Sequence, residues 1–459
     1  MFIGRTNELR RIKRRLSLDS FQAVMVYGRR RIGKTELVRE AIKESDKPSL
    51  ELIARNTNPS LNLSDFAKQA GQFMDAMSFH PQSFYELFTS LMNYSKDHPF
   101  ILFIDEFSFL MSGEEDIDAS LQKAIEQYKD TAKMTLILCG SYIDIMSKLI
   151  ESDSPLYGRF NEVILLRTFD YKDSSLFYPQ LSNEEKVQYY SVFGGTAFNI
   201  KNIDYSLPFE VKLINDFISF DSFFEKEALA TIQNETIKDA NANAILELIA
   251  SGTRKFKELN SRLGDPSKDN IGRYIRKLEE LDLIGKSFMV NDKFEKKPLY
   301  YIKDNLLDFY YTYLFRRINI RETIDPKVFF ENFIKEDFYT KYLPRKFEEI
   351  IREYVFKENG KRIPLFTSAG RLYFNKKVNK EIVNREFDLV IETKDGYLPI
   401  ECKYKDTPVT LLEVTEEMKQ WNGLPFKIVR YGFASKSGFT DEVKARKDLL
   451  LINLSDIYQ

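Results

Sequence analysis

The chain has 459 residues, of which 43% are hydrophobic and 14% aromatic, so it can form roughly two to four folded domains and is not globally disordered. Its 68 basic and 69 acidic residues nearly cancel, which confines any nucleic-acid surface to a local patch. Only two cysteines and two histidines are present, which excludes a disulfide framework and a histidine-rich zinc site and disfavours a histidine-based triad.

No membrane or export segment is predicted. The longest apolar stretches, of about eight residues, are too short to cross a bilayer. The N-terminus is charged, and its first apolar run belongs to a predicted strand rather than to a signal peptide. Cys139 and Cys402 lie in apolar, strand-like runs, where we expect free, buried thiols. We therefore expect a protein of the reducing cytoplasm.

A phosphate-binding loop is predicted between the first strand and the first long helix that follows it. Residues 21–27 (FQAVMVY) are predicted as a buried strand, and residues 36–42 (ELVREAI) as the first turns of a helix. Between them, GRRRIGKT matches G-x-x-x-x-G-K-[ST], in which backbone N–H groups and the helix N-terminus converge on phosphates. We expect Lys34 to reach the β- and γ-phosphates of ATP, and Thr35 to bind Mg²⁺. The predicted nucleotide-binding residues are Gly28, Arg29, Arg30, Arg31, Ile32, Gly33, Lys34 and Thr35.

An acidic pair follows a second predicted strand, at residues 100–106 (FILFIDE). Its five consecutive apolar residues suit a central parallel strand that is covered on both faces. We expect Asp105 to hold Mg²⁺ through water, and Glu106 to orient or deprotonate the attacking water. The alternative is an ordinary strand that ends in a solvated acidic turn. After a phosphate loop, the paired acids favour hydrolysis of the nucleotide over its storage.

Three further segments carry a family resemblance. Residues 134–140 (MTLILCG) are predicted as another buried strand, which ends at Ser141. Residues 2–9 are FIGRTNEL, and residues 154–159 are SPLYGR. Together with the two motifs above, these segments resemble the archaeal-type P-loop ATPases, relatives of the AAA+ and STAND groups, over essentially the whole chain.

The resemblance implies roles for single residues. Ser141 matches the sensor-1 position, and Asp105 and Ser141 complete the nucleotide site. Arg159 corresponds to a γ-phosphate sensor or finger, with a surface salt bridge as the alternative. Arg5 lies in the segment that contacts the nucleotide base in these proteins. Residues 194–197 (GGTA) resemble a later G-G-x-P element, in which Ala197 here replaces the proline.

Past the ATPase core, residues 166–240 suit a small helical lid, and the next segment suits a winged helix-turn-helix. Helices are predicted over 242–250, over 256–264, and from a Ser267 cap to Leu283, before a hairpin over 286–302 that turns near Asn291 and Asp292. The inner face of the third helix is predicted to comprise Ile271, Ile275, Leu278 and Leu281.

This winged helix carries a local excess of positive charge. Residues 251–303 contain 13 basic and 8 acidic side chains. Arg273, Arg276 and Lys277 fall on the outer face of the third helix, where a recognition helix would meet a DNA groove. The alternative is an internal hinge that contacts nucleotide or the next domain.

A second chemical constellation lies near the C-terminus. Residues 386–393 (EFDLVIET) and 397–403 (YLPIECK) are predicted as strands of a hairpin around a turn at 394–396. Facing residues of such a hairpin have index sums of 789 to 791, which sets Asp388 opposite residues 401 to 403. Side chains alternate along a strand, so Glu401 and Lys403 share a face. Two carboxylates and an ammonium are therefore expected at one end of a small sheet.

This arrangement resembles the D-x(n)-E-x-K motif of the PD-(D/E)XK nuclease fold. The resemblance implies that Asp388 and Glu401 hold Mg²⁺ and that Lys403 positions water. The amphipathic helix at 345–354 would lend a further acid, preferably Glu348, with Glu349 as an alternative. Gln420 matches an auxiliary polar position, and residues 435–439 (SKSGF) resemble the C-terminal domain that accompanies these ATPases. A merely salt-bridged hairpin would give a similar pattern.

The predicted fold class is α/β: a P-loop NTPase parallel sheet with a helical lid, followed by a winged helix and a C-terminal α/β PD-(D/E)XK-like domain. The predicted domains are the ATPase core at 1–165, the lid at 166–240, the winged helix at 241–303, a helical connector at 304–340, and the nuclease-like domain at 341–459.

The predicted function is ATP hydrolysis with Mg²⁺, coupled to action on DNA, with defence against mobile DNA as one setting. The rival is a STAND-like signalling switch whose C-terminal domain binds a partner without catalysis. The joint presence of Asp388, Glu401 and Lys403 favours the enzyme, whereas the near-neutral charge mildly favours the switch. The expected partners are ATP and DNA, without a membrane, and homo-oligomer formation stays open.

Overall fold

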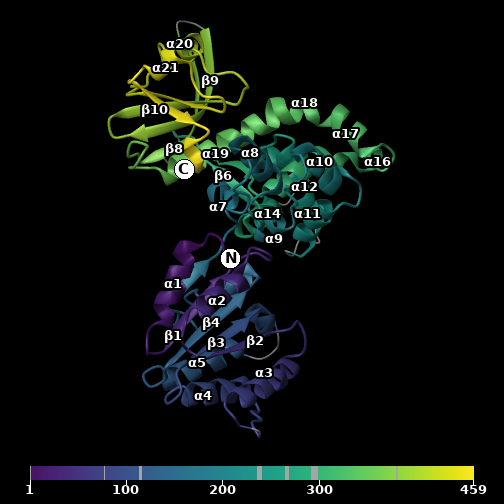
Figure 1. Cartoon of the computed structure of the whole chain (residues 1–459), viewed down its shortest axis with the longest axis vertical. Coiled ribbons are helices and arrows are strands. Elements are labelled where there is room, and N and C mark those ends of the chain that lie inside the picture. The colour runs from purple at the N-terminus through teal and green to yellow at the C-terminus, as the bar shows by residue number, and fades with distance from the viewer. Residues whose placement is uncertain are drawn as a thin grey trace. The chain divides into compact units, whose positions relative to one another are not determined.

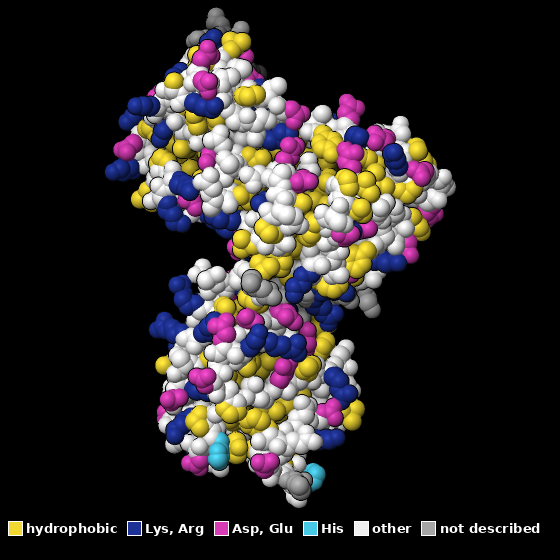
Figure 2. Space-filling model, in the orientation of Figure 1, with side chains coloured by type: hydrophobic (Ala, Val, Ile, Leu, Met, Phe, Trp, Pro, Cys, Tyr) yellow, Lys and Arg dark blue, Asp and Glu magenta, His cyan; other side chains and the backbone are white. Residues whose placement is uncertain are grey.

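The computed structural model describes residues 2–76, 78–112, 116–234, 240–263, 268–290, 298–378 and 381–459. The chain forms two compact units (Figure 1). Unit 1 comprises Met1–Thr168 and Thr196–Phe198, and unit 2 comprises Phe169–Gly195 and Asn199–Gln459. Basic and acidic side chains are interspersed on the visible face (Figure 2), as the near-zero net charge leads one to expect.

Unit 1 is built on a five-stranded sheet in the order β2-β3-β4-β1-β5, in which all neighbouring strands are parallel. The strands are β1 (Gln22–Tyr27), β2 (Ser49–Ile53), β3 (Phe100–Asp105), β4 (Met134–Gly140) and β5 (Glu162–Leu165). Every residue of β1, β3 and β4 is buried, as their continuous apolar runs require when both faces are covered. The predicted parallel α/β sheet is therefore confirmed.

Helices supply the apolar cover on the two faces. They are α1 (Thr6–Leu16), α2 (Lys34–Lys43), α3 (Pro59–Phe73), α4 (Phe84–Tyr94), η1 (Phe107–Ser112), α5 (Ile117–Tyr128) and α6 (Ile143–Lys148). Ile12 of α1 and Leu37 of α2 pack in one cluster with Val24 and Val26, whereas Phe66 of α3 and Leu87 of α4 pack in another with Met25. Alternate residues of β1 thus feed two separate cores.

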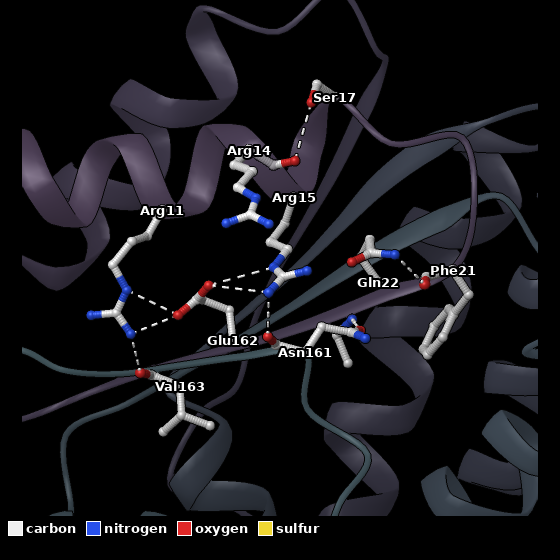
Figure 3. A network of polar contacts seen from close by, with 10 residues as sticks. Arg11, Arg14, Arg15, Ser17, Phe21, Gln22, Asn161, Glu162 and Val163 are labelled. Atoms are coloured by element: carbon white, nitrogen blue, oxygen red, sulfur yellow. Dashed lines mark hydrogen bonds and ion pairs between the residues drawn. The ribbon is translucent and has the colours of Figure 1, made fainter.

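Helix α1 is fastened to the edge strand β5 by a polar network (Figure 3). Glu162 accepts hydrogen bonds from Arg11 at 2.9 and 2.6 Å and from Arg15 at 3.4 Å. Arg15 also donates to the Asn161 carbonyl at 2.7 Å, and the Asn161 side chain accepts from the Ala23 N–H at 2.8 Å. The network adds polar contacts with β5 to the apolar packing of α1 on the sheet.

The first part of unit 2 is helical. It contains α7 (Tyr171–Ser175), α8 (Asn183–Phe193), α10 (Phe209–Leu213), η2 (Ile214–Ile218) and α11 (Phe223–Asn234), while α9 (Ala197–Lys201) spans the point where unit 1 ends. Next come α12 (Ala240–Ala250), α13 (Phe256–Leu263), α14 (Lys268–Glu280) and the antiparallel strands β6 (Ile284–Ser287) and β7 (Leu299–Ile302). The predicted inner-face residues Ile271, Ile275, Leu278 and Leu281 are buried. Ser267, Asn291 and Asp292 lie outside the described residues.

A second run of helices leads to the C-terminal sheet. It contains α15 (Asn305–Phe309), η3 (Tyr310–Leu314), η4 (Phe315–Arg317), α16 (Ile318–Arg321), α17 (Pro326–Phe333), α18 (Lys335–Asp337), η5 (Phe338–Tyr342) and α19 (Leu343–Lys357). Buried ion pairs tie α15 to α19, because Asp308 contacts Lys346 at 2.6 Å and Arg345 at 2.7 Å.

The C-terminal sheet has the order β12-β11-β10-β9-β8. Its strands are β8 (Ser368–Val378), β9 (Glu381–Thr393), β10 (Gly396–Lys403), β11 (Tyr431–Ser435) and β12 (Leu449–Asn453). Strands β8 to β10 are antiparallel, and β10 to β12 are parallel. One face packs on α19, and the remaining short helices are α20 (Leu411–Lys419), α21 (Asp441–Lys444) and η6 (Asp456–Tyr458).

The register of β9 and β10 agrees with the hairpin arithmetic. Thr393 pairs with Gly396 and Leu389 with Ile400, an index sum of 789 at the lower end of the predicted range. Continued by one step, this register sets Asp388 opposite Glu401. No sequence pattern indicated, however, the register shift between β8 and β9, where Arg371 alone faces both Asp388 and Leu389.

None of the helices in the described part of the chain has the length and hydrophobicity that a bilayer crossing requires. Both cysteines are free, as expected, but only Cys139 is fully buried and Cys402 is half-buried. Burial raises the pKa of both thiols well above its ordinary value.

Candidate functional site

The phosphate loop connects β1 to α2 through three residues with positive φ. Gly28 has φ 150°, Arg31 has φ 66° and Gly33 has φ 94°. A Cβ on Gly28 would lie 2.2 Å from the Leu166 carbonyl oxygen, so this position requires glycine. The helix that follows begins at Lys34, which directs its free N–H groups toward the loop.

Lys34 begins a chain of hydrogen bonds across three neighbouring strands. Its buried ammonium donates to the Arg29 carbonyl at 2.8 Å and to Ser141 Oγ at 3.0 Å. The Ser141 hydroxyl in turn donates to Glu106 Oε1 at 2.8 Å. Since β4 lies between β1 and β3, Ser141 at its end reaches both partners. The carboxyl ends of the three strands thus bring together Lys34, Ser141 and Glu106.

A second contact joins the loop to the acidic pair. Thr35 Oγ1 donates to Asp105 Oδ2 at 2.8 Å, and Asp105 Oδ1 accepts from the Glu106 N–H at 2.9 Å. Glu106 has φ 53°, a strained backbone for a non-glycine residue. Its Oε2 is buried without a hydrogen-bond partner among the described residues. The hydroxyl and carboxylate oxygens are hard ligands that suit Mg²⁺, and the unpartnered oxygen can accept from water.

Aromatic residues hold the arginines of the loop. Arg30 donates to the Tyr142 hydroxyl at 2.9 Å, with its guanidinium 5.1 Å from the centre of that ring. The Arg31 guanidinium lies 4.5 Å from the centre of the Phe198 ring, and the Phe198 N–H donates to the Arg31 carbonyl at 3.2 Å. The end of the GGTA element, with Ala197, therefore closes on the loop although its proline is missing.

The two arginines named from the family resemblance take different places. Arg159 forms an ion pair with Glu126 of α5 at 2.7 Å and donates to the Tyr157 carbonyl at 2.8 Å. This contact is the surface salt bridge named above as the alternative to nucleotide sensing. Arg5 is buried and donates to the carbonyls of Ile32 and Arg167, so it supports the backbone of the phosphate loop.

In the C-terminal sheet, the two acids predicted from the sequence, Asp388 and Glu401, each contact a basic side chain. Lys403 binds Glu401 at 2.9 Å and Glu417 of α20 at 2.6 Å, and Gln420 donates to Glu417. A small pocket is lined by side chains that include Asp388, Glu401, Glu417 and Trp421. The sequence predicted the pair of Glu401 and Lys403, but nothing in it singled out Glu417.

Asp388 lies beside Arg371 rather than beside Lys403. The Arg371 guanidinium is 3.6 Å from Asp388 and 4.0 Å from Glu348, and it binds Glu386 at 3.0 Å. Glu349, the alternative to Glu348, instead pairs with Lys346 at 2.9 Å. Of Glu348 and Glu349, Glu348 is therefore the one directed to Asp388.

Burial shapes the electrostatics of this cluster. Burial and the neighbouring Asp388 raise the pKa of Glu348 to about 8. Burial also raises the pKa of Glu401, although Lys403 opposes the shift. Carboxylates with such pKa values favour a proton or a cation as a partner, which fits a divalent ion. Over the described ranges, however, no three His, Cys, Asp or Glu side chains are close enough to hold a metal ion as they stand.

The predicted DNA-contacting residues lie on α14. Arg273 and Arg276 are exposed and Lys277 is half-buried, on the side away from the buried Ile271 and Ile275. None of the three forms an ion pair with another residue that the structure describes. A helix with a buried apolar face and a free basic face can approach a polyanion.

Two family models match the chain. Residues 2–203 match the ATPase domain predominantly from Archaea, and residues 310–420 match a family described as archaeal and bacterial proteins of unknown function. The uncharacterized protein MJECL04 of Methanocaldococcus jannaschii is 28% identical over 412 residues, or 88% of either chain. The Walker-type ATPase PABY2304 of Pyrococcus abyssi shares the fold, with a TM-score of 0.50 and 16% identity over 68% of this chain and 96% of its own.

Proposed function

We propose that this chain, which carries an archaeal-type P-loop ATPase domain and a C-terminal domain of a family of unknown function, uses ATP to control action on DNA. The observation that carries the proposal is the hydrogen-bonded chain from Lys34 through Ser141 to Glu106. It connects the residue expected at the γ-phosphate to the residue expected to activate water. Loss of the γ-phosphate would therefore change hydrogen bonds at the carboxyl ends of three adjacent strands.

The residues of the site have distinct tasks. Lys34 exchanges its contacts with the Arg29 carbonyl and Ser141 for the phosphates, and the loop N–H groups bind the remaining oxygens. Thr35 and, through water, Asp105 would hold Mg²⁺, which neutralises charge on the phosphates. Glu106 takes the proton of the attacking water through Oε2. The Ser141 hydroxyl meanwhile donates a hydrogen bond to the other carboxylate oxygen of Glu106, Oε1.

The finer division of the chain belongs to the same proposal. A lid at 166–240, a winged helix at 241–303 and a connector at 304–340 are supported by the order of helices and strands. The winged helix would bind DNA through Arg273, Arg276 and Lys277. The mixed sheet with α19 on one face supports a PD-(D/E)XK-like domain at 341–459, in which Asp388, Glu401 and Glu348 hold Mg²⁺ and Lys403 positions water.

The test combines two readouts on one purified protein. Linear, circular and single-stranded DNA are incubated with Mg²⁺ or Mn²⁺, with and without ATP, while phosphate release and strand cleavage are followed. We expect hydrolysis that Glu106→Gln removes, and cleavage that Asp388→Ala removes. ATP hydrolysis without cleavage on any substrate would exclude the nuclease step. Hydrolysis that Glu106→Gln leaves intact would show that Glu106 does not activate the attacking water.

A second candidate function is a STAND-like switch whose C-terminal domain only binds a partner. The observation that favours it is the pairing of the acidic residues with Arg371 and Lys403, which leaves no three-residue metal group in the described ranges. The two candidates differ in metal binding. Calorimetry of the nucleotide-free chain with Mn²⁺ should show a site that depends on Asp388 for the nuclease, and no such site for the switch.

A further inference from the structure

Arg371 is held at an irregular point of the C-terminal sheet. It lies on β8, where the register with β9 shifts so that Arg371 faces both Asp388 and Leu389. Such a bulge turns a side chain away from the direction that strict alternation gives it. Here it accompanies an Asp388 carboxylate that lies 3.6 Å from the Arg371 guanidinium.

The main chain of Arg371 is bound by a segment from another part of unit 2. The Val290 N–H, beyond the end of β6, donates to the Arg371 carbonyl at 2.8 Å, and Met289 forms a parallel bridge with Arg371. A Cβ on Gly370 would lie 2.6 Å from the Phe288 carbonyl oxygen, so the close approach requires glycine. Residues 288–290 therefore extend the sheet at its β8 edge.

The same segment takes part in the core of the sheet. Val290 is buried in an apolar cluster with Leu372, Phe387 and Trp421. The Phe387 and Trp421 rings are stacked with their centres 3.8 Å apart. Phe387 immediately precedes Asp388, and Trp421 lines the pocket that contains Asp388 and Glu401. A shift of residues 288–290 would thus move the main chain of Arg371 and change the packing beside Asp388.

The contacts of Arg371 are those that a metal ion would need. Its guanidinium lies within 4.0 Å of Glu348 and Asp388, and both oxygens are ligands that a divalent cation uses. A guanidinium and a divalent metal ion repel each other, so each weakens the binding of the other to the same pair of carboxylates. The arginine charge is permanent, so only movement of the side chain can free the acids.

We propose that Arg371 is an internal counter-cation that competes with a divalent metal ion for Asp388 and Glu348, and that residues 288–290 set its position. This inference rests on the proposed metal site. The acidic cluster then takes up metal when the 288–290 segment shifts on β8. The contact makes metal uptake conditional on the part of unit 2 that carries the basic face of α14.

The experiment measures Mn²⁺ binding by calorimetry to the full chain without nucleotide. We expect Arg371→Ala and Arg371→Gln to bind Mn²⁺ about tenfold or more tighter than the parent, since a competing charge is gone. Gly370→Ala should give a smaller gain, because its Cβ must displace the Phe288 carbonyl. Arg446→Ala, which removes a surface arginine paired with Asp448, is the matched control and should bind as the parent does.

Two further variants separate this inference from the proposed function. Asp388→Ala should abolish binding in both the parent and the Arg371→Gln background. If Asp388→Ala weakens binding but the Arg371 variants bind like the parent or more weakly, the counter-cation role is wrong and the metal site stands. If Asp388→Ala changes nothing, or the Arg371 variants bind no Mn²⁺, the metal site and the inference are both overturned. ATP binding at unit 1 and thermal unfolding report whether each variant is folded.

Discussion

The two candidate sites of this molecule differ in what holds their reactive groups. In unit 1, Thr35 contacts Asp105, and Lys34 reaches Glu106 through Ser141, so the side chains that we predict to bind and hydrolyse ATP are bound to one another. In unit 2, the acids are bound by Lys403 and Arg371 instead. The first site is organised before its ligand arrives, whereas the second must exchange ion pairs to accept one. The site in unit 1 is built from buried side chains at the ends of parallel strands. In unit 2, by contrast, the Asp388 side chain is 44% exposed.

The largest expected effect removes the ligand from the organised site. Lys34→Ala should weaken ATP binding by at least about two orders of magnitude, because a charge-assisted contact with the β- and γ-phosphates is lost. Calorimetry with ATP and Mg²⁺ measures it. Lys43→Ala, exposed at the other end of α2, is the matched control and should leave affinity unchanged. Equal ATP affinity in the Lys34 variant would refute the site.

The next effect separates binding from chemistry in the same site. Glu106→Gln should retain ATP but slow hydrolysis by about two orders of magnitude, the scale for loss of a general base. Phosphate release under saturating ATP measures the rate, and the exposed Glu36→Gln on α2 is the control. Turnover at the parent rate would mean that Glu106 has only a structural role.

A third prediction concerns cooperation in the acidic site. Asp388→Ala and Glu401→Ala should each remove Mn²⁺ binding from the nucleotide-free chain. Because both acids would hold one ion, the double variant should be no worse than either single variant. Calorimetry checks it, with Glu442→Ala on α21 as the control. Additive losses in the double variant would indicate that the two acids hold separate ions.

The smallest effect concerns Glu353, a half-buried acid of α19 outside both sites. Burial, Asp170 and Glu349 raise the pKa of Glu353 to about 7. The folded state therefore retains a proton that the unfolded chain releases near pH 4.5, and stability should fall as the pH rises from about 4.5 to 7. Glu353→Gln should remove this dependence and stabilise unit 2 by about 1–3 kcal/mol at pH 8.

Thermal unfolding of parent and variant at pH 4 and pH 8 measures the Glu353 effect. The two proteins should unfold at similar temperatures at pH 4, where Glu353 is protonated in both states, and should differ at pH 8. A constant difference across this range would show that the substitution acts through packing instead of charge. A pH-dependent difference would show that unit 2 buries a destabilising carboxylate charge outside its candidate site.

The two sites also differ in how far the sequence revealed them. The phosphate loop is contiguous from Gly28 to Thr35, and its glycine positions follow from local backbone geometry. The register of β9 and β10, which sets Asp388 opposite position 401 when it is continued by one step, likewise follows from a short turn. The bulge beside Asp388 arises from the pairing of β9 with β8. Because β8 contains no recognisable motif, the sequence did not predict the contact of Arg371 with Asp388. Arg159 finds its partner Glu126 on a separate helix, which no local pattern specifies.

Aromatic partners of the phosphate loop were missed for the same reason. Tyr142 and Phe198 contact Arg30 and Arg31 only because the fold returns distant segments to the loop. The GGTA run gave a partial signal for Phe198, since the family resemblance drew attention to its neighbour Ala197. Short-range spacing thus predicts groups within one turn or one hairpin, and side-chain partners across elements require the folded chain.

The return of Thr196–Phe198 to unit 1 has a consequence for how the protein is made. A ribosome synthesises the chain from its N-terminus, so Phe198 emerges only after α7 and α8 have been synthesised. The ATPase core of a nascent chain therefore lacks the ring that covers Arg31 until part of unit 2 is already outside the ribosome. During translation, unit 1 therefore cannot be completed by Thr196–Phe198 until Phe169–Gly195 of unit 2 has been synthesised.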